Sequence, residues 1–264
     1  MFFATDKHHQ PVEELAKDDF AVIDDERVIR DFRSFSRADL TKLDVVVLMD
    51  SSDSVLPRFR PQMADVLQLI TQWPWNQDDN LSIMSFSGLE PHLLCDGNCR
   101  NWFDADRVAL PPGGGETPLF DALDVAANAL IERRQPDIWQ VIILFSDGQD
   151  TISKHSYADA KEKLLENGVL VYTVDVSEAS QPSYGIATLR KIADDSGGRC
   201  LSIAEGVDTI LNDVINDLES ARVVTYIAPQ SSADFHAIRI LPTRNLNLQF
   251  RSRRGYYHHS GGAR

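Results

Sequence analysis

The stretch from Leu43 to Ser54, which reads LDVVVLMDSSDS, constrains the fold of this chain more than any other part of the sequence. It is a run of Val and Leu that stops at an aspartate, and serines follow that aspartate at alternate positions. A second apolar run, WQVIILF at residues 139–145, also ends in polar residues. Continuously apolar strands are typical of parallel sheets that helices cover on both faces. We therefore expect two buried strands of one sheet with polar groups at their carboxyl ends.

From Leu43 to about residue 221, apolar strands alternate with amphipathic helices. The predicted helices, with apolar residues three and four positions apart, cover residues 58–73, 118–133, 154–167, 186–195 and 207–221. The predicted strands cover residues 43–50, 81–86, 92–95, 139–145, 169–176 and 199–203. This alternation indicates an α/β fold with a doubly wound, mostly parallel sheet. We assign residues 41–221 to it.

The two ends of the chain differ from this central part, because short β-like segments replace the helices. These predicted strands cover residues 2–5, 20–23, 28–35, 223–227, 236–241 and 246–251. The first forty residues hold ten acidic and six basic residues, whereas residues 235–264 hold six arginines and no acidic residue. The simplest arrangement pairs residues 1–40 with residues 222–264 in a small β module. Cross-strand ion pairs would add about 0.2–1 kcal/mol each.

The net charge of the chain limits the classes of partner that it can bind. Its 264 residues carry 40 acidic and 26 basic side chains, a formal net charge of −14. Such a surface repels nucleic acids and anionic membranes, and attracts cations. No apolar run approaches the ~20 residues of a transmembrane helix, so we expect no membrane span. The chain as written also begins without the basic and apolar stretches of a signal peptide.

Oxygen-bearing side chains from three segments are expected at one edge of the sheet, because ligands of open α/β sheets bind beyond the carboxyl ends of the strands. They are Asp50, Ser52 and Ser54 after the first strand, Thr117 after Gly113-Gly114-Gly115-Glu116, and Asp147 after the second apolar run. Hard oxygen donors without nitrogen or sulfur suit Mg²⁺, Mn²⁺ or Ca²⁺ better than zinc or copper. Two carboxylates and three neutral hydroxyls supply little negative charge to a divalent ion. The ion could therefore also bind an anionic oxygen from another molecule.

These five residues resemble a known motif. The Asp-x-Ser-x-Ser of Asp50, Ser52 and Ser54, the Thr117 of a Gly-rich loop and the Ser-Asp-Gly at Asp147 are similar, in order and spacing, to the metal-ion-dependent adhesion site (MIDAS) of von Willebrand factor A (VWA) domains. The flanks TDKHHQPVEELAKDDFAVIDD and RSRRGYY are similar to a bacterial VWA-related subfamily described from acidobacteria.

The resemblance implies a Rossmann-like domain that binds a divalent cation, Mg²⁺ before Mn²⁺ or Ca²⁺. Through it, the domain would bind a carboxylate of a protein partner as an adhesion or scaffold module. Asp50, Ser52, Ser54 and Thr117 would contact the metal, and Asp147 would bind it directly or through water. It also implies a secreted or periplasmic location, and a last helix, before residue 221, that moves when ligand binds.

The sequence gives less support to other functions. Each of the site residues alone would pass for a helix cap. A Mg²⁺-dependent phosphohydrolase of the haloacid dehalogenase type needs a second aspartate two residues after its nucleophile, and this chain has Ser52 there. No Gly-x-Ser-x-Gly elbow marks a serine hydrolase, and no Lys-Ser/Thr follows the glycine run to hold a nucleotide. A structural domain with a vestigial metal site stays open, as does a Cys95–Cys99 bridge beside the lone Cys200.

Overall fold

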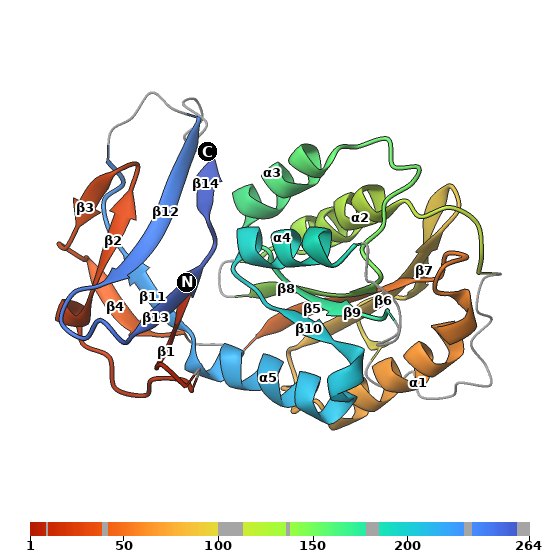
Figure 1. Cartoon of the computed structure of the whole chain (residues 1–264), viewed down its shortest axis with the longest axis horizontal. Coiled ribbons are helices and arrows are strands. Elements are labelled where there is room, and N and C mark those ends of the chain that lie inside the picture. Colours follow the sequence, from red (N-terminus) through yellow and green to blue (C-terminus); the bar gives the residue numbers. More distant parts are fainter. Residues whose placement is uncertain are drawn as a thin grey trace.

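The computed structural model describes residues 1–8, 10–38, 42–99, 113–135, 138–177, 185–229 and 234–257. It has two lobes: an α/β lobe formed by the middle of the chain, and a β lobe formed by both of its ends (Figure 1). No helix in the described ranges is long and apolar enough to cross a membrane.

A six-stranded sheet forms the centre of the α/β lobe, with the strand order β10-β9-β8-β5-β6-β7. All neighbouring strands pair in parallel except β6 and β7, which form an antiparallel hairpin. The strands are β5 (Leu43–Asp50), β6 (Asn80–Ser87), β7 (Glu90–Cys95), β8 (Trp139–Ser146), β9 (Leu170–Asp175) and β10 (Cys200–Ser202). The predicted doubly wound, mostly parallel sheet is confirmed.

Helices cover both faces of this sheet, which explains why its central strands have no polar side (Figure 1). Along β5, Val45, Val47 and Met49 pack with α1 and α5, whereas Val46 and Leu48 pack on the opposite face with α2. Alternate side chains of a strand point to opposite faces, so both sets must be apolar. The helices are α1 (Leu56–Gln72), α2 (Leu119–Glu132), α3 (Tyr157–Asn167), α4 (Ile186–Ser196) and α5 (Val207–Ser220).

The β lobe consists of two four-stranded antiparallel sheets, ordered β13-β1-β11-β4 and β14-β12-β2-β3. Each sheet combines strands from both ends of the chain, as the sequence predicted. Phe2, Phe20, Val22 and Phe32 form its buried core. The strands are β1 (Phe2–Thr5), β2 (Phe20–Asp24), β3 (Arg27–Ile29), β4 (Ser34–Arg37), β11 (Arg222–Thr225), β12 (Phe235–Pro242), β13 (Gln249–Ser252) and β14 (Gly255–Tyr257). On this pairing we propose residues 1–40 and 222–264 as one domain and residues 41–221 as the other.

The strand predictions were less accurate in the β lobe. Residues 28–35 do not form one strand, because β3 and β4 belong to different sheets. The strand that the alternation of apolar and polar residues predicted over residues 246–251 is too long. Leu246 is 78% exposed, and β13 begins only at Gln249. The Asn245 side chain accepts a hydrogen bond of 3.1 Å from the backbone N–H of Asn247, which makes a turn there instead of a strand.

The basic tail pairs mainly with the α/β lobe. Arg251 forms an ion pair with Asp217 of α5 at 2.5 Å, and Arg254 pairs with Asp194 of α4 at 3.4 Å. Among the described residues, Arg244 with Asp18 is the one ion pair that joins an arginine of the tail to an acidic residue of the head. The excess of arginine in the tail therefore holds the two lobes together more than it pairs strands.

Cys95 and Cys99 form a disulfide at the end of β7, which answers the question that their spacing left open. Cys200, in β10, is a free thiol. Disulfides persist mainly in oxidising compartments.

Candidate metal centre

The carboxyl ends of β5 and β8 lie side by side at the centre of the large sheet. The two strands pair in parallel, with Met49 opposite Phe145, so Asp50 and Ser146 follow at the same edge. Asp147 comes directly after Ser146. This register brings together the polar residues that end the two apolar runs.

The Asp50 carboxylate is fully buried and accepts three hydrogen bonds. Its Oδ1 accepts from the Ser52 hydroxyl at 2.6 Å and from the Ser52 backbone N–H at 3.0 Å. Its Oδ2 accepts from the Ser146 hydroxyl at 2.7 Å. The Ser52 and Ser54 hydroxyls lie 3.2 Å apart, and Ser54 is exposed. Asp50, Ser52 and Ser54 therefore form a continuous line of oxygens from the buried end of β5 to the surface.

Burial raises the pKa of Asp50 to about 6, and the negative charge of Asp147 adds to this rise. The hydrogen bonds from Ser52 and Ser146 act in the opposite direction but do not cancel the effect of burial. Asp147 is itself 8% exposed, and both of its oxygens accept hydrogen bonds from Gln149. Two neighbouring carboxylates are thus held at a site from which water is largely removed.

Thr117 lies in the loop that crosses between these two strand ends, and it is 3% exposed. The first half of this loop contacts the segment after β5: the Asp53 N–H donates to Gly115 O at 3.0 Å, and the Gly114 N–H donates to Ser51 O at 2.7 Å. Thr117 itself contacts the segment after β8, because its N–H donates to the Thr151 hydroxyl at 2.7 Å. The loop that carries Thr117 therefore contacts both of the other predicted segments, the one after β5 and the one after β8.

The glycines of this loop allow that close approach. A Cβ at Gly113 would lie 2.9 Å from Ser51 O, and one at Gly114 would lie 2.9 Å from the Asp53 carboxylate. Gly114 and Gly115 also have φ values of 115° and 89°, which glycine adopts readily.

Two nearby aspartates belong to helix starts. Asp150 accepts a hydrogen bond from the Phe120 N–H at the start of α2. Asp121 accepts from the N–H groups of Lys154 and His155, ahead of α3. The bond from Phe120 satisfies a donor that the start of α2 leaves open, and the bonds from Lys154 and His155 hold the loop before α3 against the first turn of α2.

Ser146 is a member of the site that sequence reasoning did not count. In the sequence it is the serine of the Ser-Asp-Gly motif at Asp147, and its hydroxyl contacts the Asp50 carboxylate directly. The sequence signal was its position directly after the apolar run WQVIILF.

A divalent cation fits these residues. Their donors are all oxygens, and no lysine or arginine within the described ranges forms an ion pair with Asp50 or Asp147. A cation at this edge would balance two carboxylates that otherwise repel each other.

A second cluster that could hold a metal lies in the β lobe. Candidate ligand atoms of Asp24, Asp25 and His236 lie within 4.8 Å of one another. Asp24 is fully buried, and it accepts hydrogen bonds from the hydroxyls of Tyr226 at 2.7 Å and Tyr256 at 3.1 Å. His236 Nδ1 lies 3.0 Å from Asp24 Oδ1, so both oxygens of the Asp24 carboxylate have polar partners within the protein.

Comparison with known proteins gives one curated relative and many solved structures of the same fold. The 60 kDa subunit of a magnesium chelatase from Cereibacter sphaeroides is 24% identical over 185 residues, which are 58% of this chain and 33% of that subunit. The chain thus spans about a third of the length of that relative.

Among solved structures, proximal thread matrix protein 1 from the mussel byssus, with a zinc-occupied MIDAS motif, has a TM-score of 0.54 and 16% identity, covering 69% of this chain and 47% of that one. The ArnB paralog VWA2 from Sulfolobus acidocaldarius has a TM-score of 0.49 and 19% identity, covering 84% of this chain and 55% of that one. Residues 44–217 match the von Willebrand factor type A domain. This chain belongs to the von Willebrand factor type A domain family.

Proposed function

We propose that this protein binds a divalent cation through Asp50, Ser52, Ser54, Thr117 and Asp147, and binds a carboxylate of a protein partner through that cation. The observation that carries the proposal is the burial of Asp50 beside a second carboxylate, without a cationic side chain among the described residues to balance them. The bound cation would supply the positive charge that an acidic group of the partner needs.

The buried and the exposed residues of the site have different roles in this proposal. Asp50 is held by Ser52 and Ser146 at the buried end of the site, so its carboxylate is oriented before any cation binds. Ser54 is exposed, and its hydroxyl lies on the side from which a partner approaches. The oxygen donor set favours Mg²⁺, Mn²⁺ or Ca²⁺, with Mg²⁺ first. The zinc in the MIDAS motif of the mussel protein supports a divalent ion at this edge, so zinc belongs in the same titration.

Peptide selection tests the partner chemistry. A random peptide library should yield sequences rich in Asp and Glu when it is selected on the protein with Mg²⁺, and not when EDTA is present. The enrichment should disappear in Asp50→Ala. Asp175→Asn is a control, because Asp175 is also a buried aspartate, at 8% exposed, and ends β9, the strand on the other side of β8 from β5. Acidic peptides selected equally well with EDTA would contradict metal-mediated binding.

Catalysis is the competing function, because the curated relative is a subunit of a magnesium chelatase. The geometry favours binding. A phosphohydrolase of the haloacid dehalogenase type would need an acid–base carboxylate at position 52, and the Ser52 hydroxyl there donates to Asp50 instead. Hydrolysis of a phosphate ester with Mg²⁺, lost in Asp50→Asn, would reverse this order of preference.

A further inference from the structure

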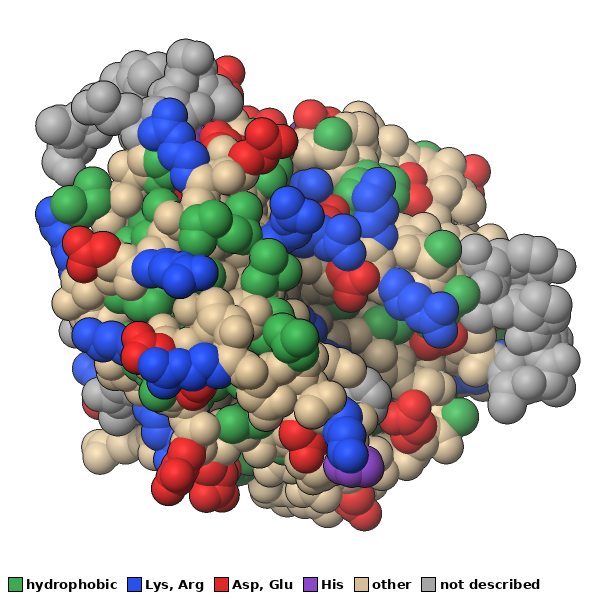
Figure 2. Space-filling view, turned by 60° about the vertical axis from the view of Figure 1, so that its left-hand side comes forward, with side chains coloured by type: hydrophobic (Ala, Val, Ile, Leu, Met, Phe, Trp, Pro, Cys, Tyr) green, Lys and Arg blue, Asp and Glu red, His purple; other side chains and the backbone are tan. Residues whose placement is uncertain are grey.

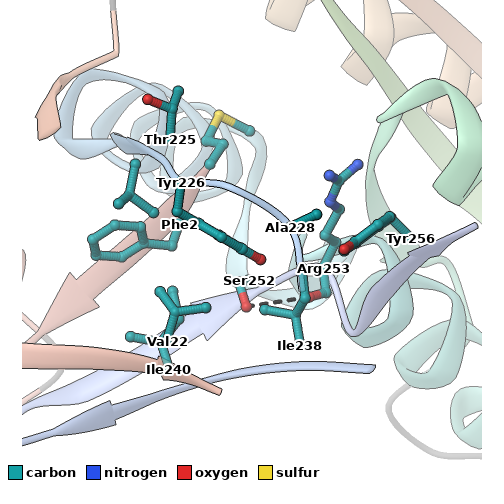
Figure 3. A pocket seen from close by; sticks show the side chains of 12 residues that line it. Phe2, Val22, Thr225, Tyr226, Ala228, Ile238, Ile240, Ser252, Arg253 and Tyr256 are labelled. Atoms are coloured by element: carbon teal, nitrogen blue, oxygen red, sulfur yellow. Dashed lines mark hydrogen bonds between the residues drawn. The ribbon is translucent and has the colours of Figure 1, made fainter. Parts of the chain in front are cut away.

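A cavity of about 290 Å³ lies between the two sheets of the β lobe, away from the candidate metal centre (Figure 3). Phe2 reaches it from β1, Val22 from β2, and Ile238 and Ile240 from β12. Figure 3 shows Phe2, Val22 and Ile240 on one side of the cavity and Arg253 and Tyr256 on the other, with Ile238 below Arg253. The cavity is partly open to solvent, since Ala228 in its lining is exposed, so a small molecule can reach its apolar wall from outside.

The polar end of the cavity is formed by Arg253, which lies between β13 and β14. Burial lowers the pKa of its guanidinium, and none of the acidic residues that the structure describes forms an ion pair with it. The neighbouring arginines differ, because Arg251 pairs with Asp217 and Arg254 pairs with Asp194. Lys and Arg side chains also gather beside a hollow on the face in Figure 2. Arg253 thus presents a partly dehydrated positive charge to an apolar space.

The tyrosines at this end do not balance that charge. Tyr226 and Tyr256 both donate their hydroxyl hydrogens to Asp24 Oδ2, at 2.7 Å and 3.1 Å. Burial, together with the negative charge of Asp24, raises the pKa of both phenols. They stay neutral at physiological pH, so neither phenol supplies a counter-charge for Arg253.

We propose that this cavity binds a small monocarboxylate with an apolar body, such as a medium-chain fatty acid. The carboxylate pairs with the Arg253 guanidinium, whose planar fork matches two carboxylate oxygens. The apolar body lies among Phe2, Val22 and Ile238. The volume is at the lower end of the roughly 300–1,000 Å³ range of small-molecule sites, which fits a short acid better than a folded peptide segment.

A structural role for Arg253 is the simplest alternative. Its Nη1 donates to Leu165 O near the end of α3, a position where cations are favoured. That hydrogen bond is long, at 3.4 Å, and uses one of the five N–H donors of a guanidinium. It explains neither the apolar cavity nor the missing counter-charge.

Isothermal titration calorimetry of the full chain with sodium octanoate tests the proposal, with 1-octanol as the uncharged probe. Octanoate should bind at one saturable site, more tightly than octanol. Arg253→Gln should weaken octanoate by about 10- to 100-fold, because hydrogen bonds to a charged group are lost. Arg254→Gln, at the exposed neighbouring arginine, should leave octanoate binding unchanged.

A second pair of variants tests the cavity itself. Ala228 is exposed and lines the cavity, whereas Ile227 is 68% exposed and lies outside the lining. Ala228→Trp should therefore weaken octanoate binding, and Ile227→Trp should not, while circular dichroism should show that all four variants remain folded at the temperature of the titration. Absence of saturable binding, or equal affinity in the unmodified protein, Arg253→Gln and Ala228→Trp, would overturn the proposal. Octanoate affinity that does not change with EDTA separates this site from the metal centre.

Discussion

The Ser146 hydroxyl donates a hydrogen bond of 2.7 Å to Asp50 Oδ2, and both residues are fully buried. This bond joins the last residues of β5 and β8, the two apolar strands at the centre of the sheet. It orients one oxygen of the Asp50 carboxylate, while the buried Ser52 holds the other oxygen and Ser54 lies exposed at the surface. Ser146 is therefore a positioning residue of the proposed metal site.

Ser146→Ala should weaken divalent-metal binding by about 10- to 100-fold, which is the usual cost of losing a group that orients a metal ligand. Calorimetric titration with Mn²⁺ measures this change. Ser85→Ala is a suitable control, because Ser85 is also buried in the sheet but its hydroxyl has no hydrogen-bond partner among the described residues. Equal metal affinity in both variants would show that Ser146 does not position Asp50.

The raised pKa of Asp50 predicts how the metal-free protein responds to pH. The folded carboxyl titrates near pH 6 and the unfolded one near its ordinary value of 3.8, so the folded state holds the proton more tightly. Stability is therefore expected to fall as pH rises from about 4 to about 6, by up to about 3 kcal/mol from this group.

Urea unfolding in EDTA, at several pH values, measures this slope. Asp50→Asn cannot lose a proton, so this part of the slope should vanish and the variant should gain stability at pH 7 relative to the metal-free unmodified protein. Excess Mg²⁺ should reverse the slope in the unmodified protein, because the cation favours the ionised carboxylate. Identical pH profiles for the two metal-free proteins would contradict burial as the cause of the raised pKa.

At the opposite end of β5, the fully buried Asp44 forms a two-pronged ion pair with Arg133, with N···O distances of 3.0 and 3.1 Å. Arg133→Met leaves the Asp44 carboxylate buried without a counter-charge, and should reduce the free energy of unfolding by about 3 kcal/mol. Arg134→Met, at the exposed neighbour, should have little effect. If Arg133→Met lowered the free energy of unfolding by less than about 1 kcal/mol, the pair would contribute no more than an ordinary surface ion pair, and the prediction would be wrong.

The sequence predicted the α/β lobe well because burial on both faces leaves a strong pattern there. Runs such as LDVVVLM and WQVIILF have few alternatives to central strands, and Gly168 ends α3 with φ 68°, as its position predicts. The β lobe was harder, since Val28 is 57% exposed and Leu246 78% exposed, so apolar residues there do not mark buried strand positions. The short strand β14 carried no such pattern at all.

The sequence also predicts some features of the candidate site and not others. The order and strand context of Asp50, Thr117 and Asp147 were visible in the sequence, because residues at strand ends converge in a parallel sheet. The contact of Ser146 with Asp50 depends on the register between β5 and β8, which apolar runs do not specify. The cavity beside Arg253 depends on pairing between strands more than two hundred residues apart, such as Phe2 with Ser252.

Metal-dependent thermal unfolding shows directly whether the site at Asp50 binds a divalent cation. The unmodified protein, Asp50→Ala and the control Asp175→Asn would be unfolded with EDTA and with Mg²⁺, Mn²⁺, Ca²⁺ or Zn²⁺. A cation that binds only the native state stabilises it by about 2.7 kcal/mol at a hundred times its dissociation constant. We expect the unfolding temperature to rise with a divalent cation in the unmodified protein and in Asp175→Asn, and not in Asp50→Ala. An unmodified protein whose unfolding temperature no divalent cation changes would contradict this expectation.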